Sequence, residues 1–261
     1  MALENTEGKL FLVGLGPGNP ALQTPAALAA LQQSDVWVGY RGYVDQVTGL
    51  AKDKELVSME LGQELERATR AVDLAFAGRT VAVISSGDAG IYGMAGPVFR
   101  VLTDRDWDGE SPPVAVVPGI SALQSAASLL GSPLMQDFCA ISLSNLLTPW
   151  ETICRRLEGA ALGDFVVVLY NPRSLRRTWQ LPEARRILLE KRAGETPVGL
   201  VKDAYRPGQR VIITNLEDLA ERAEDVDMFT TVVIGNSTTY VHNGHIVTPR
   251  GYEEKATIRS D

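Results

Sequence analysis

The chain has 261 residues, 45% of them hydrophobic and 22% charged, which is enough apolar side chain for a core of globular size without disulfides. Its 25 Lys and Arg stand against 32 Asp and Glu, and the formal net charge of -7 argues against sequence-independent binding to nucleic acid and against attachment to an anionic membrane. Two cysteines and two histidines are too few for a zinc or iron–sulfur site or a disulfide framework, so we expect no metal.

The first half of the chain alternates short apolar strands with amphipathic helices. The pattern predicts strands over residues 9–14, 35–38, 80–85 and 114–117, and helices over 64–76 and 91–102 and from near Ser121. A further helix begins after Thr24, which can cap it, with Pro25 at its first position. Continuous apolar strands are typical of a parallel sheet that is covered on both faces.

The second half repeats this alternation after a break near residue 133, where Gly131 and Pro133 end a helix. The pattern predicts strands over 138–143, 165–169, 198–201, 211–213 and 231–234, helices from 149 and over 182–191, and a hairpin over 240–247. At about 150 residues per domain, the length allows two domains. We therefore expect an α/β fold of two domains, residues 1–133 and 134–261, with mostly parallel central sheets and a cleft between them for a small molecule.

A glycine-rich loop, VGLGPG at residues 13–18, follows the first predicted strand. It fits the dinucleotide-binding fingerprint poorly, because Asn19 stands where the third glycine belongs and no acidic residue ends the next strand. A tight turn, or a close approach of the backbone to another ligand, also explains the glycines. An NAD-dependent oxidoreductase therefore stays open as one alternative.

Two further loops follow predicted strands, SSGDAGIYG at residues 85–93 and VPGIS at residues 117–121. Open α/β sheets bind their ligands at the carboxyl ends of the strands, where these loops lie. Asp88 offers a carboxylate to a hydroxyl or an amine. Asp88 and Ser121 also precede predicted helices, so helix capping is the alternative interpretation of both.

The three loops together, with GLGPG, SGDAGIYG and PGISA in this order, resemble the tetrapyrrole methylase family of class III S-adenosylmethionine-dependent methyltransferases. The resemblance covers about residues 9–252 and implies that S-adenosylmethionine is the methyl donor and S-adenosylhomocysteine the product. It places around this cofactor Pro17, Ser86, Gly87, Asp88, Ile91, Tyr92, Ser121, Ala122, Tyr170, Asn171, Asp203 and Ala204.

The second half resembles one subgroup of this family. FCAISLSNLLTPW at residues 138–150 and DFVVVLYNPRS at residues 164–174 are similar to the members that methylate precorrin-3B at C(17) with ring contraction to precorrin-4 in cobalamin biosynthesis. The resemblance also implies a homodimer. Asn145 departs from it, because an Asp is expected at that position.

The substrate of such enzymes carries many carboxylates, and residues 171–192 hold seven cations against two anions in an otherwise acidic chain. Arginine suits carboxylates because its planar group can bind them with two hydrogen bonds. For residues 185–192 we favour a solvated helix face instead. The candidate contacts to this anionic tetrapyrrole are Tyr40, Arg41, Ser142, Asn145, Arg173, Arg176 and Arg177.

Several alternatives stay open at this point. A sibling methylase acting on another precorrin position, or a non-catalytic tetrapyrrole-binding protein, fits the same motifs, and no general acid or base for the ring contraction can be assigned. The N-terminal residues show no secretion signal pattern, and the longest apolar run, residues 165–170, is far short of the roughly 20 residues that span a membrane. We therefore expect a soluble, cytoplasmic protein.

Overall fold

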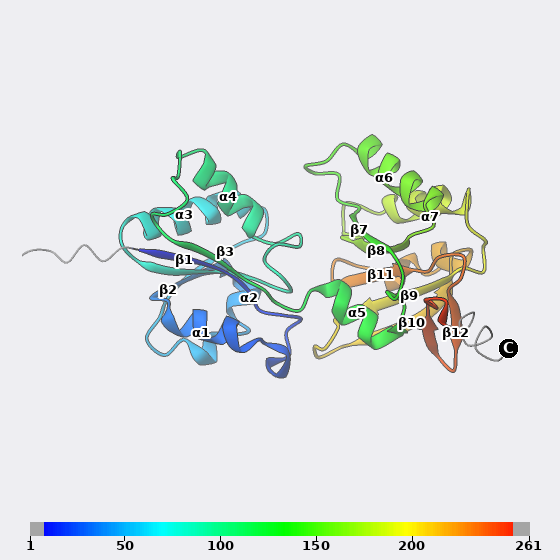
Figure 1. The fold of residues 1–261 in the computed structure, drawn as a ribbon, viewed down its shortest axis with the longest axis horizontal. Coiled ribbons are helices and arrows are strands. Elements are labelled where there is room, and N and C mark those ends of the chain that lie inside the picture. Colours follow the sequence, from blue (N-terminus) through cyan, green and yellow to red (C-terminus); the bar gives the residue numbers. More distant parts are fainter. Residues whose placement is uncertain (1–7, 253–261) are drawn as a thin grey trace, which may run out of the picture. The chain divides into compact units, whose positions relative to one another are not determined.

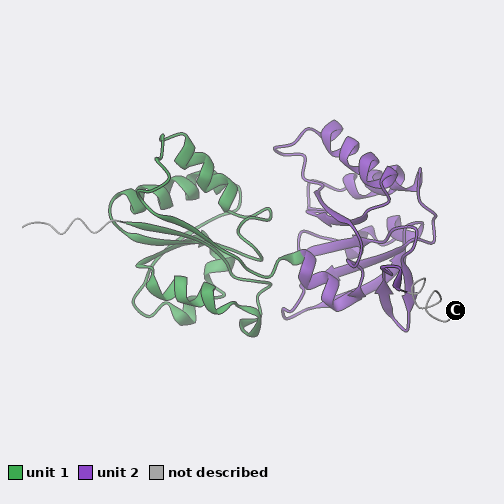
Figure 2. Ribbon diagram, viewed as in Figure 1, with its two compact units in different colours: residues 1–122 green, residues 123–261 purple. Residues whose placement is uncertain are grey.

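The computed structural model describes residues 8–252. The outer ends of the two expected domains lie outside the described residues. Residues 1–7, part of the N-terminal segment in which no secretion signal pattern was found, lie outside them too. The chain forms two compact units, residues 1–122 and 123–261 (Figures 1 and 2).

Unit 1 contains one five-stranded sheet in the order β3-β2-β4-β1-β5, with all four pairings parallel, as expected from its continuous apolar strands. The sequence pattern missed its edge strand, whose Glu55 and Leu56 are exposed, so that no continuous apolar run marks it. The strands are β1 (Lys9–Gly14), β2 (Val36–Tyr40), β3 (Glu55–Met59), β4 (Thr80–Ser85) and β5 (Val114–Val117).

Helices cover both faces of this sheet (Figure 1). Successive residues of a strand point to opposite faces, and accordingly Leu10 and Leu12 join the core under α3 and α4, whereas Phe11 and Val13 join the core under α1 and α2. The helices are α1 (Pro25–Gln33), α2 (Arg41–Val44), α3 (Glu64–Phe76) and α4 (Ala95–Thr103), with 3-10 turns η1 (Pro20–Leu22) and η2 (Thr48–Leu50).

Helix α4 begins four residues later than predicted. Tyr92 adopts a left-handed conformation with φ of 53°, and the Met94 amide donates to Ser85 Oγ at 3.0 Å instead of entering a helical turn. The predicted helical turn over 91–94 is therefore wrong, and these residues extend the loop after β4.

Unit 2 contains a second five-stranded sheet in the order β10-β9-β11-β8-β7. Only the pairing of β7 with β8 is parallel, and the other three are antiparallel, so the expectation of mostly parallel sheets holds for unit 1 alone. The short connection between β9 and β10 suits an antiparallel pair, whereas a parallel pair needs a long crossover. The strands are β7 (Phe138–Ser142), β8 (Val166–Tyr170), β9 (Pro197–Lys202), β10 (Arg210–Asn215) and β11 (Thr230–Ile234).

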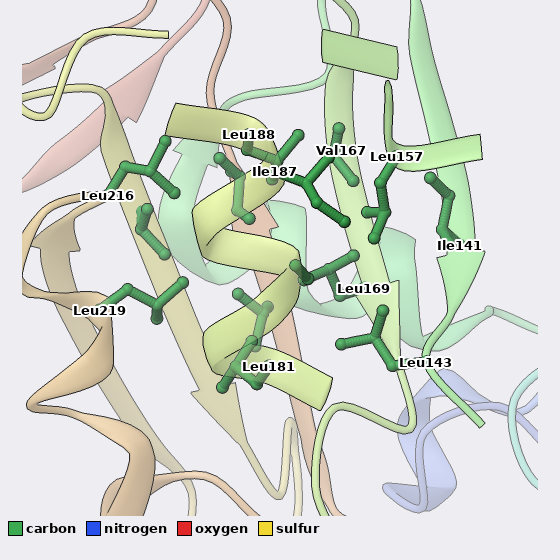
Figure 3. Close-up of a cluster of buried hydrophobic side chains, with 14 of the residues drawn as sticks. Ile141, Leu143, Leu157, Val167, Leu169, Leu181, Ile187, Leu188, Leu216 and Leu219 are labelled. Carbon is green, nitrogen blue, oxygen red and sulfur yellow. The ribbon is translucent and has the colours of Figure 1, made fainter. Parts of the chain in front are cut away.

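Two buried clusters hold unit 2 together, one on each face of its sheet. Val167 and Leu169 of β8 pack with the apolar sides of α6 and α7 (Figure 3). Val166 and Val168 point the other way, toward α5 and the small sheet β12-β13-β6. The remaining elements are α5 (Ala122–Leu130), β6 (Gly131–Ser132), α6 (Trp150–Leu162), α7 (Gln180–Leu189), η3 (Asp218–Ala220), η4 (Ala223–Asp225), β12 (Tyr240–His242) and β13 (His245–Val247).

The junction between the units falls at residues 122/123, not near residue 133 as expected from the helix-breaking residues. Leu123, Ala126 and Leu130 of α5 are buried against β8 of unit 2, so contacts assign this helix to the second unit. The predicted hairpin is present, with positive φ at both Asn243 and Gly244. Among the described residues, no helix has the length and apolar character needed to cross a membrane.

Candidate functional site

In unit 1 the three motif loops meet at one edge of the sheet. They follow β1, β4 and β5, which are neighbours in the sheet and, being parallel, end at the same edge. The Gly16 amide donates to Gly87 O at 3.0 Å and the Gly87 amide to Gly16 O at 2.8 Å, which joins the first two loops by a backbone bridge. The carbonyl of Ser85 accepts from the Leu15 amide at 2.9 Å.

Glycines allow the loops to come this close. A Cβ atom on Gly119 would lie 2.2 Å from Gly87 O and 2.6 Å from Gly14 O, and one on Gly14 would lie 2.7 Å from the Gly119 nitrogen. No side chain fits at such distances. Close backbone packing between loops therefore explains Gly14, whereas positive φ explains Gly16 (75°).

Asp88 connects two of the loops rather than capping a helix. Its Oδ1 atom accepts from the Gly90 amide at 2.8 Å, and its Oδ2 atom accepts from the Gly119 amide at 3.0 Å. Helix α4 begins only at Ala95, and no side chain caps it. Each carboxylate oxygen can accept a further hydrogen bond, so Asp88 still has the capacity to bind a ligand hydroxyl.

The edge where these loops meet is a topological switch point. β1 leads to α1 on one face of the sheet, and its neighbour β4 leads to α4 on the other face (Figure 1). Ligands of open α/β sheets bind outside the carboxyl ends of strands at such points. The location therefore favours a small-molecule site in unit 1.

The other predicted residues of unit 1 differ in accessibility. Pro17 and Ser121 are buried within the loops, and Ser86 and Ala122 are half-buried. Gly87 lies close to Ser121 and Ala122, since a Cβ atom on it would be 3.6 Å from atoms of both. Ile91 and Tyr92 have 37% and 54% of their surface exposed, so this loop presents an apolar and an aromatic side chain.

Tyr40 and Arg41 lie at the carboxyl end of β2, next to β4 in the sheet. The Tyr40 ring packs edge-on against Tyr43, with ring centroids 5.1 Å apart. Arg41 is exposed and forms an ion pair with Glu60 at 2.9 Å.

In unit 2 the predicted residues also gather at strand ends. β7, β8 and β9 run in the same direction, because β8 and β9 are both antiparallel to β11. Ser142 at the end of β7 accepts a hydrogen bond of 3.0 Å from Nδ2 of Asn171, which follows β8. Tyr170 Oη accepts from the Leu123 amide at 2.9 Å.

Several residues at these strand ends have backbone conformations that side chains seldom adopt. Asn171, Asp203 and Tyr205 have φ of 50°, 48° and 59°. Such conformations cost of order 1–3 kcal/mol each and cluster at functional sites. Ala204 lies between two of them, so the Asp203-Ala204 turn is held in an uncommon shape.

The three arginines of the loop after β8 have different surroundings. Arg173 donates to Ala223 O at 2.5 Å and lines a pocket of about 470 Å³ with Val226, Met228 and Phe229 among others. Arg176 is exposed. Arg177 is buried, with 7% of its surface exposed, and burial lowers the pKa of its guanidinium.

The remaining arginines of the basic segment serve the fold. Arg185 donates to the carbonyls of Leu216 and Glu217, and Arg186 forms ion pairs with Glu183 and Glu190 on the exposed side of α7. The favoured interpretation of a solvated helix face thus holds for Arg186, whereas Arg185 is half-buried. It is wrong for Arg192, which follows the end of α7 and is buried. Fewer of the seven cationic side chains in residues 171–192 are therefore available to a ligand than the sequence alone indicates.

Sequence reasoning missed part of this edge. Gln180 at the start of α7 is buried and donates to Asn145 Oδ1 at 3.1 Å. Met228 and Phe229, at the pocket, are exposed large apolar residues. Exposed apolar side chains cannot be told from core ones by composition alone, so no sequence signal marked them.

Comparison with known proteins adds to this geometry. A family model described as Tetrapyrrole (Corrin/Porphyrin) Methylases matches residues 9–220. The chain is 51% identical over 253 residues to a cobalt-factor III methyltransferase of Priestia megaterium, covering 97% of this chain but only 46% of that protein, so it spans about half of that relative's length. It is 46% identical over 243 residues to a probable cobalt-factor III C(17)-methyltransferase of Salmonella typhimurium, covering 93% of this chain and 99% of the relative.

Solved structures share the fold over most of the chain. A crystal structure of the methyltransferase CobJ has a TM-score of 0.87 at 37% identity and covers 93% of this chain and 100% of that one. A uroporphyrin-III C-methyl transferase of Thermus thermophilus, complexed with S-adenyl homocysteine, has a TM-score of 0.69 at 27% identity and covers 87% and 97% of the two chains.

Proposed function

Since the chain belongs to the tetrapyrrole (corrin/porphyrin) methylase family, we propose that it transfers a methyl group from S-adenosylmethionine to C(17) of a precorrin-3B-type macrocycle and contracts the ring. The product is precorrin-4 or its cobalt counterpart, an intermediate of cobalamin biosynthesis. The meeting of the three motif loops at the switch point of the unit 1 sheet is the observation that carries this proposal.

Methyl transfer from a sulfonium needs alignment more than acid or base strength. The macrocycle carbon supplies the electron pair of the new C–C bond, the S–CH₃ bond breaks, and a neutral thioether leaves. Holding donor and acceptor in line can supply a large part of the rate. A glycine-rich edge with fixed loops suits this task, because it lets backbone groups approach a ligand closely.

The residues of the unit 1 edge fit an adenosine-containing donor. Asp88 retains acceptor capacity for a ribose hydroxyl, and Ile91 and Tyr92 offer exposed apolar surface to the purine. Pro17, Ser86, Gly87, Ser121 and Ala122 form the surrounding loops. In unit 2, Tyr170, Asn171, Asp203 and Ala204 are proposed to contact the same donor from the strand ends of that unit.

The macrocycle is proposed to contact Tyr40 and Arg41 in unit 1, and Ser142, Asn145, Arg173, Arg176 and Arg177 in unit 2. An anionic substrate needs local positive charge on a chain of net charge -7, and the loop after β8 supplies it. Asn145 stands in a hydrogen bond with Gln180, so it acts here as a neutral acceptor where an Asp was expected from the family resemblance.

We propose that the substrate is the cobalt-containing macrocycle. Both relatives with the higher identities carry cobalt-factor III in their names, which favours the cobalt-containing macrocycle for this chain too. Paired incubations with cobalt-factor III and with precorrin-3B, compared by kcat/KM, test this. A higher kcat/KM for the metal-free macrocycle would contradict the cobalt form.

The methylase itself is tested by mass analysis of the tetrapyrrole after incubation with S-adenosylmethionine. The proposal requires a gain of one CH₂ unit together with formation of S-adenosylhomocysteine. Binding of the macrocycle with no gain in mass would indicate a carrier, and methylation at a carbon other than C(17) would indicate a sibling methylase. We also propose a cytoplasmic homodimer, which light scattering of the purified chain and fractionation of its source cells would test.

A further inference from the structure

Three arginine side chains are buried in the part of the chain that the structure describes. Each has one buried nitrogen without a hydrogen-bond partner among the described residues, which is Nε in Arg67 and Arg192 but the terminal Nη2 in Arg177. Arg67, Arg177 and Arg192 have 3%, 7% and 7% of their surface exposed. Taking a guanidinium out of water is costly unless hydrogen bonds and opposite charge compensate for it. The partners of each arginine therefore indicate its role.

Arg192 has a structural role. Its two terminal nitrogens donate to the carbonyls of Gly235 at 2.7 Å, Ala160 at 3.1 Å and Phe165, which ties three segments of unit 2 together. Burial lowers the pKa of Arg192, and the nearby Asp164 partly opposes this effect. Both terminal nitrogens donate hydrogen bonds, and the Asp164 carboxylate lies near enough to raise the pKa of the guanidinium.

Arg67 follows the same pattern in unit 1. Its Nη2 atom donates to Glu60 O at 2.7 Å, and its Nη1 atom lies 3.4 Å from the Met94 sulfur. Burial lowers its pKa, and Glu64 opposes this effect. Arg67 and Arg192 thus each have short bonds from a terminal nitrogen and a compensating carboxylate.

Arg177 differs in every one of these respects. Its Nε atom donates to Asn171 O at 3.2 Å and its Nη1 atom lies 3.5 Å from Ser144 Oγ, and both distances are long. Its Nη2 atom is buried and has no hydrogen-bond partner among residues 8–252. Burial lowers the pKa of Arg177, and no carboxylate in the described part of the chain opposes this effect. A buried cation with an unused terminal N–H is compensated when an anion binds.

We infer that Arg177 anchors a carboxylate-binding subsite at the carboxyl edge of β7 and β8, an inference that rests on the proposed function. The Asn171 carbonyl occupies Nε, so the two terminal nitrogens are left for an end-on pair of hydrogen bonds. The contact of Nη1 with Ser144 is long, and a charge-assisted bond to a carboxylate is stronger. The ligand carboxylate would therefore replace Ser144 as the partner of Nη1 and provide the missing partner of Nη2.

Two sources can provide this carboxylate, namely a carboxylate side chain of the macrocycle and the amino-acid end of the methyl donor. Isothermal titration calorimetry separates them, with a porphyrin octacarboxylate as one probe and S-adenosylhomocysteine as the other. The proteins are the unmodified chain, Arg177→Gln, Arg177→Lys and, as a control outside the site, Arg186→Gln. The methyl ester of the porphyrin shows how much of its affinity depends on carboxylates.

We expect Arg177→Gln to weaken the binding of one probe at least tenfold and to leave the other unchanged. Arg177→Lys should weaken it less, because the charge remains while the planar pair of donors is lost. Arg186→Gln should bind both probes like the unmodified chain. If the porphyrin is the affected probe, its ester should bind the unmodified chain and Arg177→Gln equally. Unchanged affinity for both probes, or equal loss of both, would overturn the subsite.

Thermal unfolding without ligand provides a readout independent of binding and of methyl transfer. If Arg177 is kept for a ligand, Arg177→Met should have the same Tm as the unmodified chain or a higher one, because an uncompensated buried charge is removed. Arg192→Met should lower Tm by several degrees, because three carbonyls lose their donor. A fall in Tm for Arg177→Met as large as that for Arg192→Met would assign Arg177 to the fold and overturn the inference.

Discussion

The Oδ2 atom of Asp88 accepts a hydrogen bond of 3.0 Å from the backbone amide of Gly119. This bond links the loop after β4 to the loop after β5, and the bridge between Gly16 and Gly87 links the loop after β1 to the loop after β4. The three sequence motifs thus form one connected structure at the edge of the sheet. A change at any of these positions should affect the shape of the whole edge.

Asp88→Ala should weaken the binding of S-adenosylhomocysteine about tenfold and lower the free energy of unfolding by about 1–3 kcal/mol, because two backbone amides lose their acceptor. Calorimetry gives the first quantity and urea denaturation the second. Asp88→Asn keeps one acceptor oxygen and should lie between the two proteins in both measurements. An unchanged affinity in Asp88→Ala would leave Asp88 with a purely structural role.

Gly119→Ala should destabilise unit 1 by about 3 kcal/mol or more and reduce binding of the methyl donor, because the new Cβ atom would lie 2.2 Å from Gly87 O. Backbone atoms on both sides of the contact cannot move away independently. Gly96→Ala is the matched control in α4, where a Cβ atom meets nothing within 4 Å. That variant should be more stable by about 0.5–1 kcal/mol, since alanine is the better helix former. Equal unfolding curves for the two variants would contradict this view of the loops.

Arg176→Ala should raise the KM for the macrocycle about five- to tenfold and leave the affinity for S-adenosylhomocysteine unchanged. Arg176 is the exposed arginine of the loop after β8, and its loss removes positive charge that attracts an anionic substrate. Arg186→Ala is the control, since Arg186 is also exposed but pairs with Glu183 and Glu190 on α7. Equal KM values for the two variants would mean that net charge, rather than the position of Arg176, attracts the substrate.

The stability that Asp227 provides should depend on pH. Its burial raises the pKa, but hydrogen bonds from Lys202 at 2.6 Å, from the Phe229 amide and from the Thr230 hydroxyl outweigh this effect and hold the pKa below the usual 3.8. A carboxylate whose pKa is lower in the folded state stabilises the fold above its unfolded pKa. This stabilisation is lost as the pH falls through the lowered value.

Tm should therefore be higher for the unmodified chain than for Asp227→Asn at neutral pH. The difference should begin to fall near the unfolded pKa of 3.8 and vanish only below the lowered pKa of the folded state. Scanning calorimetry from neutral pH down into acid measures it. Lys202→Met should shift the loss of the difference to higher pH, because the hydrogen bond from Lys202 is the strongest effect that lowers this pKa. A difference in Tm that is the same at every pH would show that the amide alone disturbs the segment.

The prediction of the fold was most accurate where the local sequence pattern agrees with the burial of the residues. The bounds of α3 and β4 match the sequence pattern to the residue, because both elements have a long periodic or continuous apolar run. The direction of β9, β10 and β11 could not be predicted in this way, since a short apolar run looks the same in a parallel and in an antiparallel strand. The loop from Asp203 to Gln209 has no helix, and that absence was the available sign of an antiparallel pair.

The position of the candidate site was predictable where it depends only on the direction of the strands. Loops after neighbouring parallel strands must share an edge, so the meeting of Gly16, Gly87 and Gly119 follows from the motif order once the sheet is known. The separate roles of Arg173 and Arg177 could not be predicted. They depend on where Ala223 and Asn171, 50 and 6 residues away in the chain, place their carbonyl oxygens.

The position of the transferred methyl group tests the central claim most directly. The purified chain is incubated with S-adenosylmethionine labelled with carbon-13 in its methyl group, together with cobalt-factor III or precorrin-3B, and the product is analysed by NMR. The account predicts one labelled methyl group on C(17) of a macrocycle whose ring has contracted. A label on any other carbon, or a C(17)-methylated macrocycle that keeps its original ring size, would contradict it.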